Sequence, residues 1–127
     1  MQKNIVETNQ APAAIGPYSQ ALRTGNLLFV SGQIPLEPKT GSLITTGIED
    51  ETHRVMKNIE AILEAADASF QNVVKTTIFL KNMDDFVQVN AVYASYFTGN
   101  YPARETVEVS GLPKGARVEI SVIASCD

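Results

Sequence analysis

The chain has 127 residues, 44% of them hydrophobic and 19% charged, and carries a formal net charge of −4. This length and composition predict one globular domain over residues 1–127 and exclude a disordered chain. The acidic balance disfavours nucleic-acid binding, which needs a positively charged surface. With one cysteine and one histidine, the chain can form no internal disulfide and lacks the ligands for a zinc site.

The ends and apolar stretches of the chain bear on its location. The first residues lack the apolar core of a signal peptide, and no stretch is long and apolar enough to cross a membrane as a helix. A single cysteine suits a reducing compartment. We therefore expect a cytoplasmic protein with no membrane partner, and we expect Cys126, close to the end of the chain, to be exposed.

Three strands are expected before the first helix. Residues 1–7 predict a short strand, and residues 18–24 and 27–33 predict a hairpin. Its turn lies at 25–26, a Gly-Asn pair that tolerates positive φ. Residues 35–47 carry prolines and glycines and predict a loop.

Apolar residues at helical spacing predict a helix over 48–66 with one buried stripe. Thr46 and Glu49 fit a capping box at its start. His53 has no evident partner and is expected to be exposed. The solvated face of this helix is expected to carry the charged residues Glu49, Glu51, Arg54, Lys57, Glu60 and Glu64.

The second half of the chain completes the order βββαβαββ. Residues 73–80 are apolar on both faces and rich in β-branched side chains, which predicts a central strand. A second helix is expected over 83–97, where Asn90 falls beside the apolar stripe and lies either at the solvent edge or in a site. Strands follow at 104–109 and 117–124.

Two amphipathic helices can cover only one face of such a sheet. The other face keeps apolar residues such as Val107 or Val109 and Ile123. A bare apolar face indicates a subunit contact, so we expect a homo-oligomer packed through it, with a small-ligand site at the interface.

Arg104 and Glu119 have the clearest chemical meaning. Arg104 stands at the start of an apolar strand, and a guanidinium can bind a carboxylate through two parallel hydrogen bonds. Glu119 lies inside an apolar strand, where a carboxylate is costly to bury unless a function uses it. The two residues indicate either a small-carboxylate site with a water-handling acid or a structural ion pair, and the residues alone favour neither.

Eight separated segments match one known family in the right order. They lie at 11–20, 30–35, 74–79, 85–90, 102–104, 107–109, 112–114 and 118–120. On these segments the chain resembles the RidA (YjgF-type) reactive-intermediate deaminases over essentially its whole length.

The resemblance implies a chorismate-mutase-like α+β fold with two helices on one face of the sheet. It also implies a homotrimer whose sheets line a central β-barrel, with clefts between neighbouring subunits. Such proteins are hydrolases that convert reactive enamines and imines to 2-oxo acids and ammonia. Typical substrates are 2-aminoacrylate, as 2-iminopropanoate, and 2-iminobutanoate, so small 2-imino and 2-oxo acids are the expected ligands. An imine is already electrophilic, so no metal or organic cofactor is expected.

The resemblance also assigns site residues. Arg104 corresponds to the arginine that holds the substrate carboxylate, and Glu119 to the acid that positions the hydrolytic water. The backbone at Thr106 corresponds to a contact with the imine end of the ligand. The remaining cleft-lining positions are Tyr18, Ser31, Gly32 and Asn90.

Three features depart from the commonest family pattern. Thr106 stands where many members have a cysteine, so no thiol chemistry is available there. The loop 98–101 is shorter than in some relatives, which bears on access to the cleft. Asp67 replaces a glycine often found after the first helix, and aspartate adopts a left-handed conformation only at some cost.

Other functions remain open from the residues. The same cleft could bind 2-oxo acids without catalysis or contact a protein partner, although the presence of both Arg104 and Glu119 favours an enzyme. The acidic charge, the single histidine and the lack of a basic, aromatic stripe disfavour ribonuclease activity. Ser31 has no histidine near it in sequence, which disfavours a serine-hydrolase triad. From the residues alone Tyr18 is more simply a packed aromatic, and Ser31 with Gly32 a turn.

Overall fold

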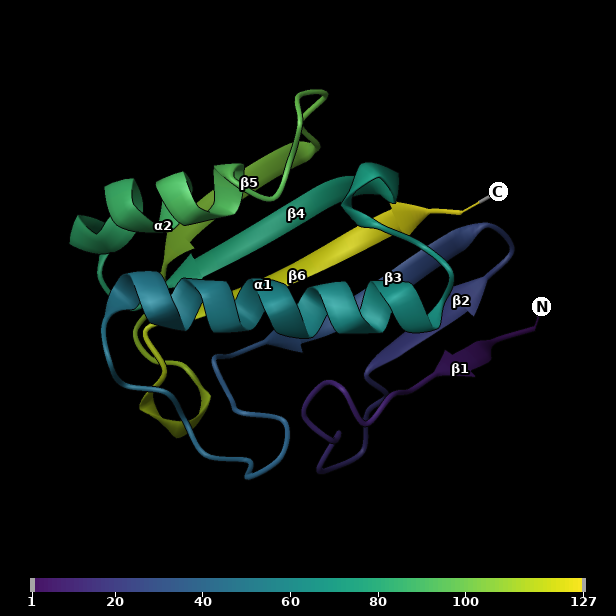
Figure 1. The fold of residues 1–127 in the computed structure, drawn as a ribbon, viewed down its shortest axis with the longest axis horizontal. Helices are drawn as coiled ribbons and strands as arrows, with labels where there is room; N and C mark the ends of the chain where they lie inside the picture. The colour runs from purple at the N-terminus through teal and green to yellow at the C-terminus, as the bar shows by residue number, and fades with distance from the viewer. Residues whose placement is uncertain (1, 127) are drawn as a thin grey trace.

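The computed structural model describes residues 2–126, which form a six-stranded sheet covered on one face by two helices (Figure 1). The helices are α1, Ile48–Ala65, and α2, Phe86–Ala94. The strands are β1 Asn4–Val6, β2 Ala21–Thr24, β3 Leu27–Gln33, β4 Val73–Leu80, β5 Ala103–Glu108 and β6 Val118–Ser125. Neither helix in the described part of the chain is long and apolar enough to span a membrane.

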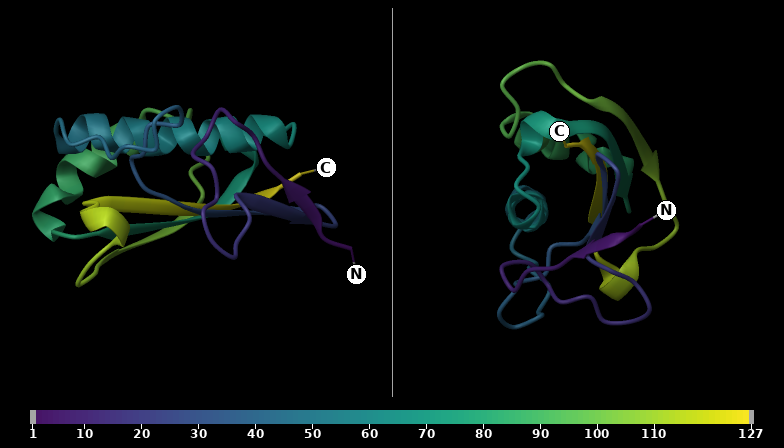
Figure 2. Two further views of the ribbon diagram at one scale, coloured as in Figure 1. Left: turned by 90° about the horizontal axis from the view of Figure 1, so that it is seen from below. Right: turned by 90° about the vertical axis from the view of Figure 1, so that its right-hand side faces the viewer.

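The strands lie in the order β1-β2-β3-β6-β4-β5, and only the β4–β5 pair is parallel. The expected order βββαβαββ is therefore confirmed, and β4 is an interior strand as its two apolar faces predicted. Seen along the edge of the sheet, α1 and α2 both lie on the same side (Figure 2).

The core lies between the helices and this face. The apolar stripe of α1 is confirmed, since Val55, Met56, Ile59, Ile62 and Leu63 are fully buried. The alternate residues Val118, Ile120 and Val122 of β6 meet that stripe. Cys126 is also buried in this core, at 4% exposure, so its expected exposure was wrong. The Cys126 backbone N–H donates to the carbonyl of Asn26, which holds this end of the chain against the hairpin turn.

Helix α2 is shorter than the predicted 83–97. At its start the Asn82 side chain accepts a hydrogen bond from the Asp84 backbone, closing a 3-10 turn over Met83–Asp85. After Ala94, backbone N–H groups bond three residues back, and the Ser95 hydroxyl donates to the Val92 carbonyl. Such local bonds replace the helical pattern at both ends.

The first predicted strand of the hairpin also begins later than expected, at Ala21. The Tyr18 backbone N–H donates to the Gly16 carbonyl, so a tight turn occupies the start of the predicted range. Two other expectations are confirmed: the turn falls at Gly25 and Asn26, and Asp67 takes a left-handed conformation with φ 58°.

The predicted capping box at Thr46 and Glu49 is wrong. The residue that caps α1 is Gly47, which has no side chain to offer. The Thr46 hydroxyl instead donates to Asp50, and the Gly47 backbone N–H donates to Glu51 at 3.2 Å. The helix start is thus stabilised from one turn further along.

Glu51 was expected on the solvated face but is 2% exposed. Arg117 donates to it twice, through Nε at 3.1 Å and through Nη2 at 2.5 Å. These hydrogen bonds raise the pKa of Arg117 above its ordinary value. A buried carboxylate requires such partners, and this one joins the start of α1 to the start of β6.

The face of the sheet away from the helices carries exposed apolar side chains. Leu27 and Phe29 of β3 are 38% and 39% exposed, and Val107 of β5 is 41% exposed. Ile123 of β6 is half-buried on the same face. The bare apolar face predicted from the helix count is therefore present among the described residues.

Candidate active site

The seven predicted site residues fall into two groups on opposite faces of the sheet. Arg104, Asn90 and Thr106 lie on the helix-covered face; we call them the arginine half-site. The glutamate half-site lies on the open face and comprises Tyr18, Ser31, Gly32 and Glu119.

Strand geometry separates the two groups. Side chains alternate between the faces of a strand, and Val118 and Ile120 point into the helix-covered core. Glu119 therefore points to the other face. Arg104 contacts helix α2, and β4 lies between β5 and β6. A structural ion pair between Arg104 and Glu119 within one chain is thus excluded.

Arg104 is held by neutral groups. Its guanidinium donates to the Asn90 side-chain oxygen at 2.6 Å. Its central carbon lies 5.1 Å from the centroid of the Tyr93 ring and 5.7 Å from that of Phe86. None of the ion pairs among residues 2–126 involves Arg104. The guanidinium charge is therefore available to an anion.

Two hollows meet at Arg104. One, of about 520 Å³, is lined by Asn90 and Tyr93 together with Tyr101 and Pro102, which lie between α2 and β5. The other, of about 630 Å³, is lined by Phe86 and Thr106 among others. Asn90 is half-buried and lines the first hollow.

Thr106 lies two residues after Arg104 and so on the same face of β5. Its hydroxyl oxygen is the one buried side-chain nitrogen or oxygen in residues 2–126 without a hydrogen-bond partner. A buried hydroxyl without a partner is unfavourable, so the position gains no stability from its polar group.

Glu119 is half-buried against Gly32. A Cβ atom at Gly32 would lie 2.9 Å from the carboxyl carbon of Glu119 and would also collide with one carboxyl oxygen. Burial raises the pKa of Glu119 above its ordinary value, because the charged form is poorly solvated there. A raised pKa makes the carboxylate of Glu119 a stronger base than that of an ordinary glutamate.

A cavity of about 810 Å³ extends from Glu119 along the loops that follow β3 and precede β2. Tyr18, Ser31 and Gly32 line it with Glu119. Tyr18 is 53% exposed, so the simpler expectation of a packed aromatic was wrong. The Ser31 hydroxyl donates to the Ser19 carbonyl at 2.6 Å, which fixes the segment beside Tyr18.

His53 confirms its expected exposure on α1 but has a partner that sequence did not reveal. One of its ring nitrogens lies 2.8 Å from the Tyr96 hydroxyl. His53 lines neither the cavity at Glu119 nor the hollows at Arg104. It therefore forms no triad with Ser31 in the chain.

Sequence reasoning missed two kinds of supporting residue. Phe86 and Tyr93 are apolar at helical spacing, which indicates only the buried side of the second helix, yet they flank Arg104. Gln20, 4% exposed, accepts from the Thr8 backbone and donates to the Pro12 carbonyl, which orders a segment bordering the Glu119 cavity. The only sequence feature that pointed to Gln20 was its place in the matched segment 11–20.

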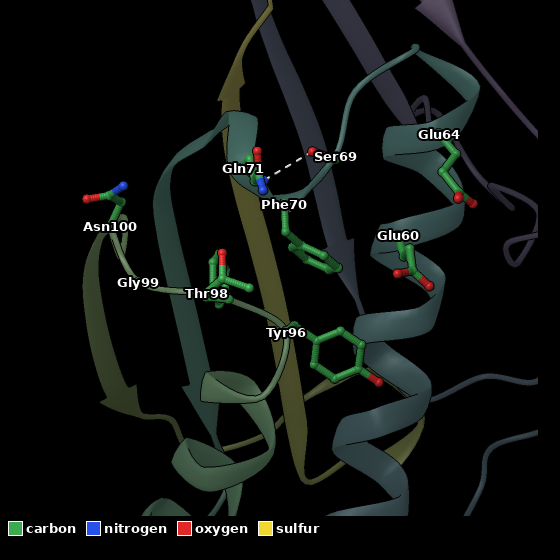
Figure 3. A pocket seen from close by; sticks show the side chains of 10 residues that line it. Glu60, Glu64, Ser69, Phe70, Gln71, Tyr96, Thr98, Gly99 and Asn100 are labelled. Carbon is green, nitrogen blue, oxygen red and sulfur yellow. Dashed lines mark hydrogen bonds between the residues drawn. The ribbon is translucent and has the colours of Figure 1, made fainter.

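A further hollow lies between α1 and the loop after α2 and contains none of the predicted site residues (Figure 3). Glu60 and Glu64 border it on one side, and Phe70 and Tyr96 form part of its wall. In that view the marked hydrogen bond runs from the Gln71 backbone to the Ser69 hydroxyl. This bond stabilises the turn at Ser69, and we assign the hollow no chemistry.

Known proteins match the chain along almost its full length. Residues 8–126 match the family described as endoribonuclease L-PSP. A RutC family protein from Pyrococcus horikoshii is 52% identical over 122 residues, covering 96% of this chain and 97% of that protein. A 2-iminobutanoate/2-iminopropanoate deaminase from Mus musculus is 47% identical over 122 residues, covering 96% and 90% respectively. The crystal structure of a Yersinia pestis protein of the conserved Rid family has a TM-score of 0.95 at 54% identity, covering 98% of this chain and 99% of that one.

Proposed function

The chain belongs to the endoribonuclease L-PSP (YjgF/RidA) family, and from this premise we propose that it is a 2-iminobutanoate/2-iminopropanoate deaminase. The enzyme hydrolyses small reactive imines to 2-oxo acids and ammonia. Its deaminase relative in mouse, 47% identical, supports this reaction. The observation that carries the proposal is the Arg104 guanidinium, which borders open hollows and has no carboxylate partner among residues 2–126.

Arg104 binds the substrate carboxylate. A guanidinium offers two parallel N–H donors to a carboxylate. One nitrogen of the Arg104 guanidinium already donates to the Asn90 side-chain oxygen, and its other N–H groups remain for the substrate. Binding the carboxylate places the neighbouring imine carbon at a fixed distance from β5. Orientation of this kind contributes strongly because the imine is intrinsically reactive.

Glu119 orients and activates the attacking water. The water oxygen bonds to the imine carbon while the Glu119 carboxylate accepts one water proton. Glu119 passes that proton to the imine nitrogen, which gives a tetrahedral adduct with a hydroxyl group and an amine. Glu119 then takes the hydroxyl proton and delivers it to the amine nitrogen as the carbon–nitrogen bond breaks, so that the oxygen becomes the carbonyl of the 2-oxo acid and ammonia leaves. Burial that raises the pKa of Glu119 favours this exchange.

We further propose that the active enzyme is a homotrimer in which each cleft combines the arginine half-site of one subunit with the glutamate half-site of its neighbour. The opposite-face arrangement supports this, because one chain cannot present Arg104 and Glu119 to one small ligand. The exposed apolar side chains Leu27, Phe29 and Val107 supply a surface for the contact.

We also infer that the chain acts as a single domain in the cytoplasm. The buried Cys126 has no disulfide partner, which is compatible with a reducing compartment. We propose imine hydrolysis and not the ribonuclease activity that the family's description names. The chain carries a net charge of −4, which disfavours RNA binding, and His53 lies outside both half-sites.

The direct test measures 2-oxo acid release from 2-iminopropanoate and 2-iminobutanoate generated in situ. We expect wild type to exceed the spontaneous rate and Arg104→Ala to fall to it, with the oligomer intact. The matched control is Arg23→Ala, which removes an arginine that bonds only its own hairpin turn and should leave activity unchanged. Spontaneous-rate hydrolysis by assembled wild type, or full activity in Arg104→Ala, would contradict the proposal.

A further inference from the structure

Three residues of α2 surround the Arg104 guanidinium from one helix face. Phe86, Asn90 and Tyr93 stand at positions i, i+4 and i+7, which share one side of an α-helix. Asn90 accepts a hydrogen bond from the guanidinium at 2.6 Å, and the two rings lie beyond it on either side along the helix. Helix α2 thus places two aromatic rings and one side-chain amide around the Arg104 guanidinium.

A hydrogen bond holds the Tyr93 ring beside the strand position of Arg104. Its hydroxyl donates to the Thr76 hydroxyl at 2.9 Å, and both residues are buried. Thr76 of β4 is the register partner of Arg104 on β5. The hydrogen bond therefore anchors the ring to the strand position beside the arginine. Burial raises the pKa of Tyr93 above its ordinary value, so the phenol stays neutral and remains a donor.

An exposed arginine side chain ordinarily samples many rotamers, and ordering it costs affinity when a ligand binds. Aromatic faces attract a guanidinium electrostatically and do not compete for the donors that a carboxylate needs. The arrangement therefore restricts Arg104 while leaving its remaining N–H groups unpaired.

We propose that Phe86 and Tyr93 are positioning residues for Arg104, and that Asn90 acts through Arg104 rather than by touching the substrate. The inference rests on the proposed carboxylate-binding role of Arg104. It assigns to the rings the task of holding the guanidinium so that the edge away from Asn90 meets the carboxylate. Because this contact is the same for substrate and transition state, its loss raises KM more than it lowers kcat.

The test compares Phe86→Leu with Phe70→Leu in the full-length oligomer. Both changes replace an aromatic ring by an aliphatic side chain, but the Phe70 ring packs on Tyr96 and Phe97, and it is Phe86 that lies by Arg104. We expect Phe86→Leu to weaken pyruvate binding, measured by calorimetry, and to raise KM for 2-iminobutanoate, each by about 3- to 10-fold. Phe70→Leu should change neither by more than about 2-fold.

A double-mutant cycle separates positioning from a general loss of packing. In an Arg104→Ala background, Phe86→Leu should produce no further change in pyruvate binding. Equal effects of Phe86→Leu and Phe70→Leu, or an undiminished effect of Phe86→Leu without Arg104, would overturn the inference. Tyr93→Phe, which keeps the ring and removes its anchor on Thr76, should give a smaller rise in KM than Phe86→Leu.

The two proposals fail in different ways. If wild type hydrolyses imines and Arg104→Ala does not, but Phe86→Leu behaves like Phe70→Leu, the inference is wrong and the proposed function stands. If wild type neither hydrolyses imines nor binds pyruvate, the proposed function fails first, and the inference falls with it.

Discussion

At the scale of single residues, the contact between Gly32 and Glu119 is the tightest constraint on the proposed acid. Any side chain at Gly32 would occupy the space of the Glu119 carboxyl group. Gly32 does not have positive φ, so its backbone accepts alanine, and the flexible carboxylate is the group that must move.

We therefore expect Gly32→Ala to leave the free energy of unfolding within about 1 kcal/mol of wild type and to lower kcat/KM for imine hydrolysis by about 100-fold. The matched control is Gly111→Ala, because a Cβ there meets nothing within 4 Å. Urea unfolding and 2-oxo acid release measure the two quantities. A fully active Gly32→Ala enzyme would show that the position of Glu119 does not matter.

Burial of Glu119 links stability to pH. Its raised pKa means that the folded protein holds this proton more tightly than the unfolded chain. As pH rises from the ordinary glutamate pKa through the raised value, the unfolded chain ionises first and the folded state loses stability. Above the raised pKa the loss is complete and constant.

Glu119→Gln removes this ionisation. We expect the variant to gain stability relative to wild type as pH rises across that window, with little difference below it. Urea midpoints of both proteins between about pH 4 and pH 8 give the comparison. A difference that stays constant with pH, or that favours wild type at the alkaline end, would rule out a raised pKa at Glu119.

Arg104 and Glu119 could be chosen from the sequence because their residue types conflict with apolar surroundings. The roles of their neighbours could not. Gly32 is ordinary in a strand, and only the structure shows that its missing side chain makes room for Glu119. Phe86 is apolar at a helical position, and periodicity cannot distinguish a core contact from a contact with a cation.

At the scale of secondary-structure elements, the pair of Glu51 and Arg117 joins the start of α1 to the start of β6, two residues before Glu119. The Glu51 side chain is 3% exposed and that of Arg117 is 44% exposed. The two partners therefore differ in what their removal leaves behind. A lone Arg117 stays hydrated, whereas a lone Glu51 is a buried charge.

Accordingly, Arg117→Ala should lower the free energy of unfolding by about 3 kcal/mol, and Glu51→Gln by about 1 kcal/mol. Urea unfolding at neutral pH, with Lys57→Ala as a surface ion-pair control, measures the asymmetry. Equal losses, or a larger loss for Glu51→Gln, would mean that the carboxylate reaches water without Arg117.

The types and order of the elements could be predicted because the spacing of apolar residues shows which side chains are buried. That spacing is helical in both helices, and it is continuous in the central strand β4, which has a neighbouring strand on each side. Their ends depended on local bonds that periodicity does not encode. Asn82 closes a 3-10 turn ahead of α2, and the capping role assigned to Glu49 belongs to the buried Glu51 two residues later. Glu51 is polar in sequence, and its burial depends on an arginine 66 positions away.

At the scale of the whole molecule, the sheet divides the proposed active site between its two faces. The chorismate-mutase-like α+β arrangement expected from the resemblance is confirmed by the fold and by its solved relatives. Sequence patterning could place Glu119 on the less apolar face of its strand. It could not place Arg104 on the opposite face, since that depends on how α2 packs over β5.

The proposed cleft, which combines Arg104 with Glu119, therefore needs two copies of the chain. Leu27 and Phe29 on the open face are 38% and 39% exposed in one chain, respectively, and the proposed assembly would cover them. In a cyclic oligomer each cleft then takes Arg104 from one subunit and Glu119 from the next. Two inactive variants can therefore complement each other.

The central claim is tested most directly by co-expressing Arg104→Ala and Glu119→Gln with different affinity tags and purifying the mixed oligomers through both. We expect each variant alone to be inactive and the doubly purified mixed oligomers to recover up to about a third of the wild-type activity, because in every mixed cyclic trimer one of the three clefts joins two intact half-sites. Mixed oligomers as inactive as the separate variants would contradict a cleft built from Arg104 of one subunit and Glu119 of its neighbour.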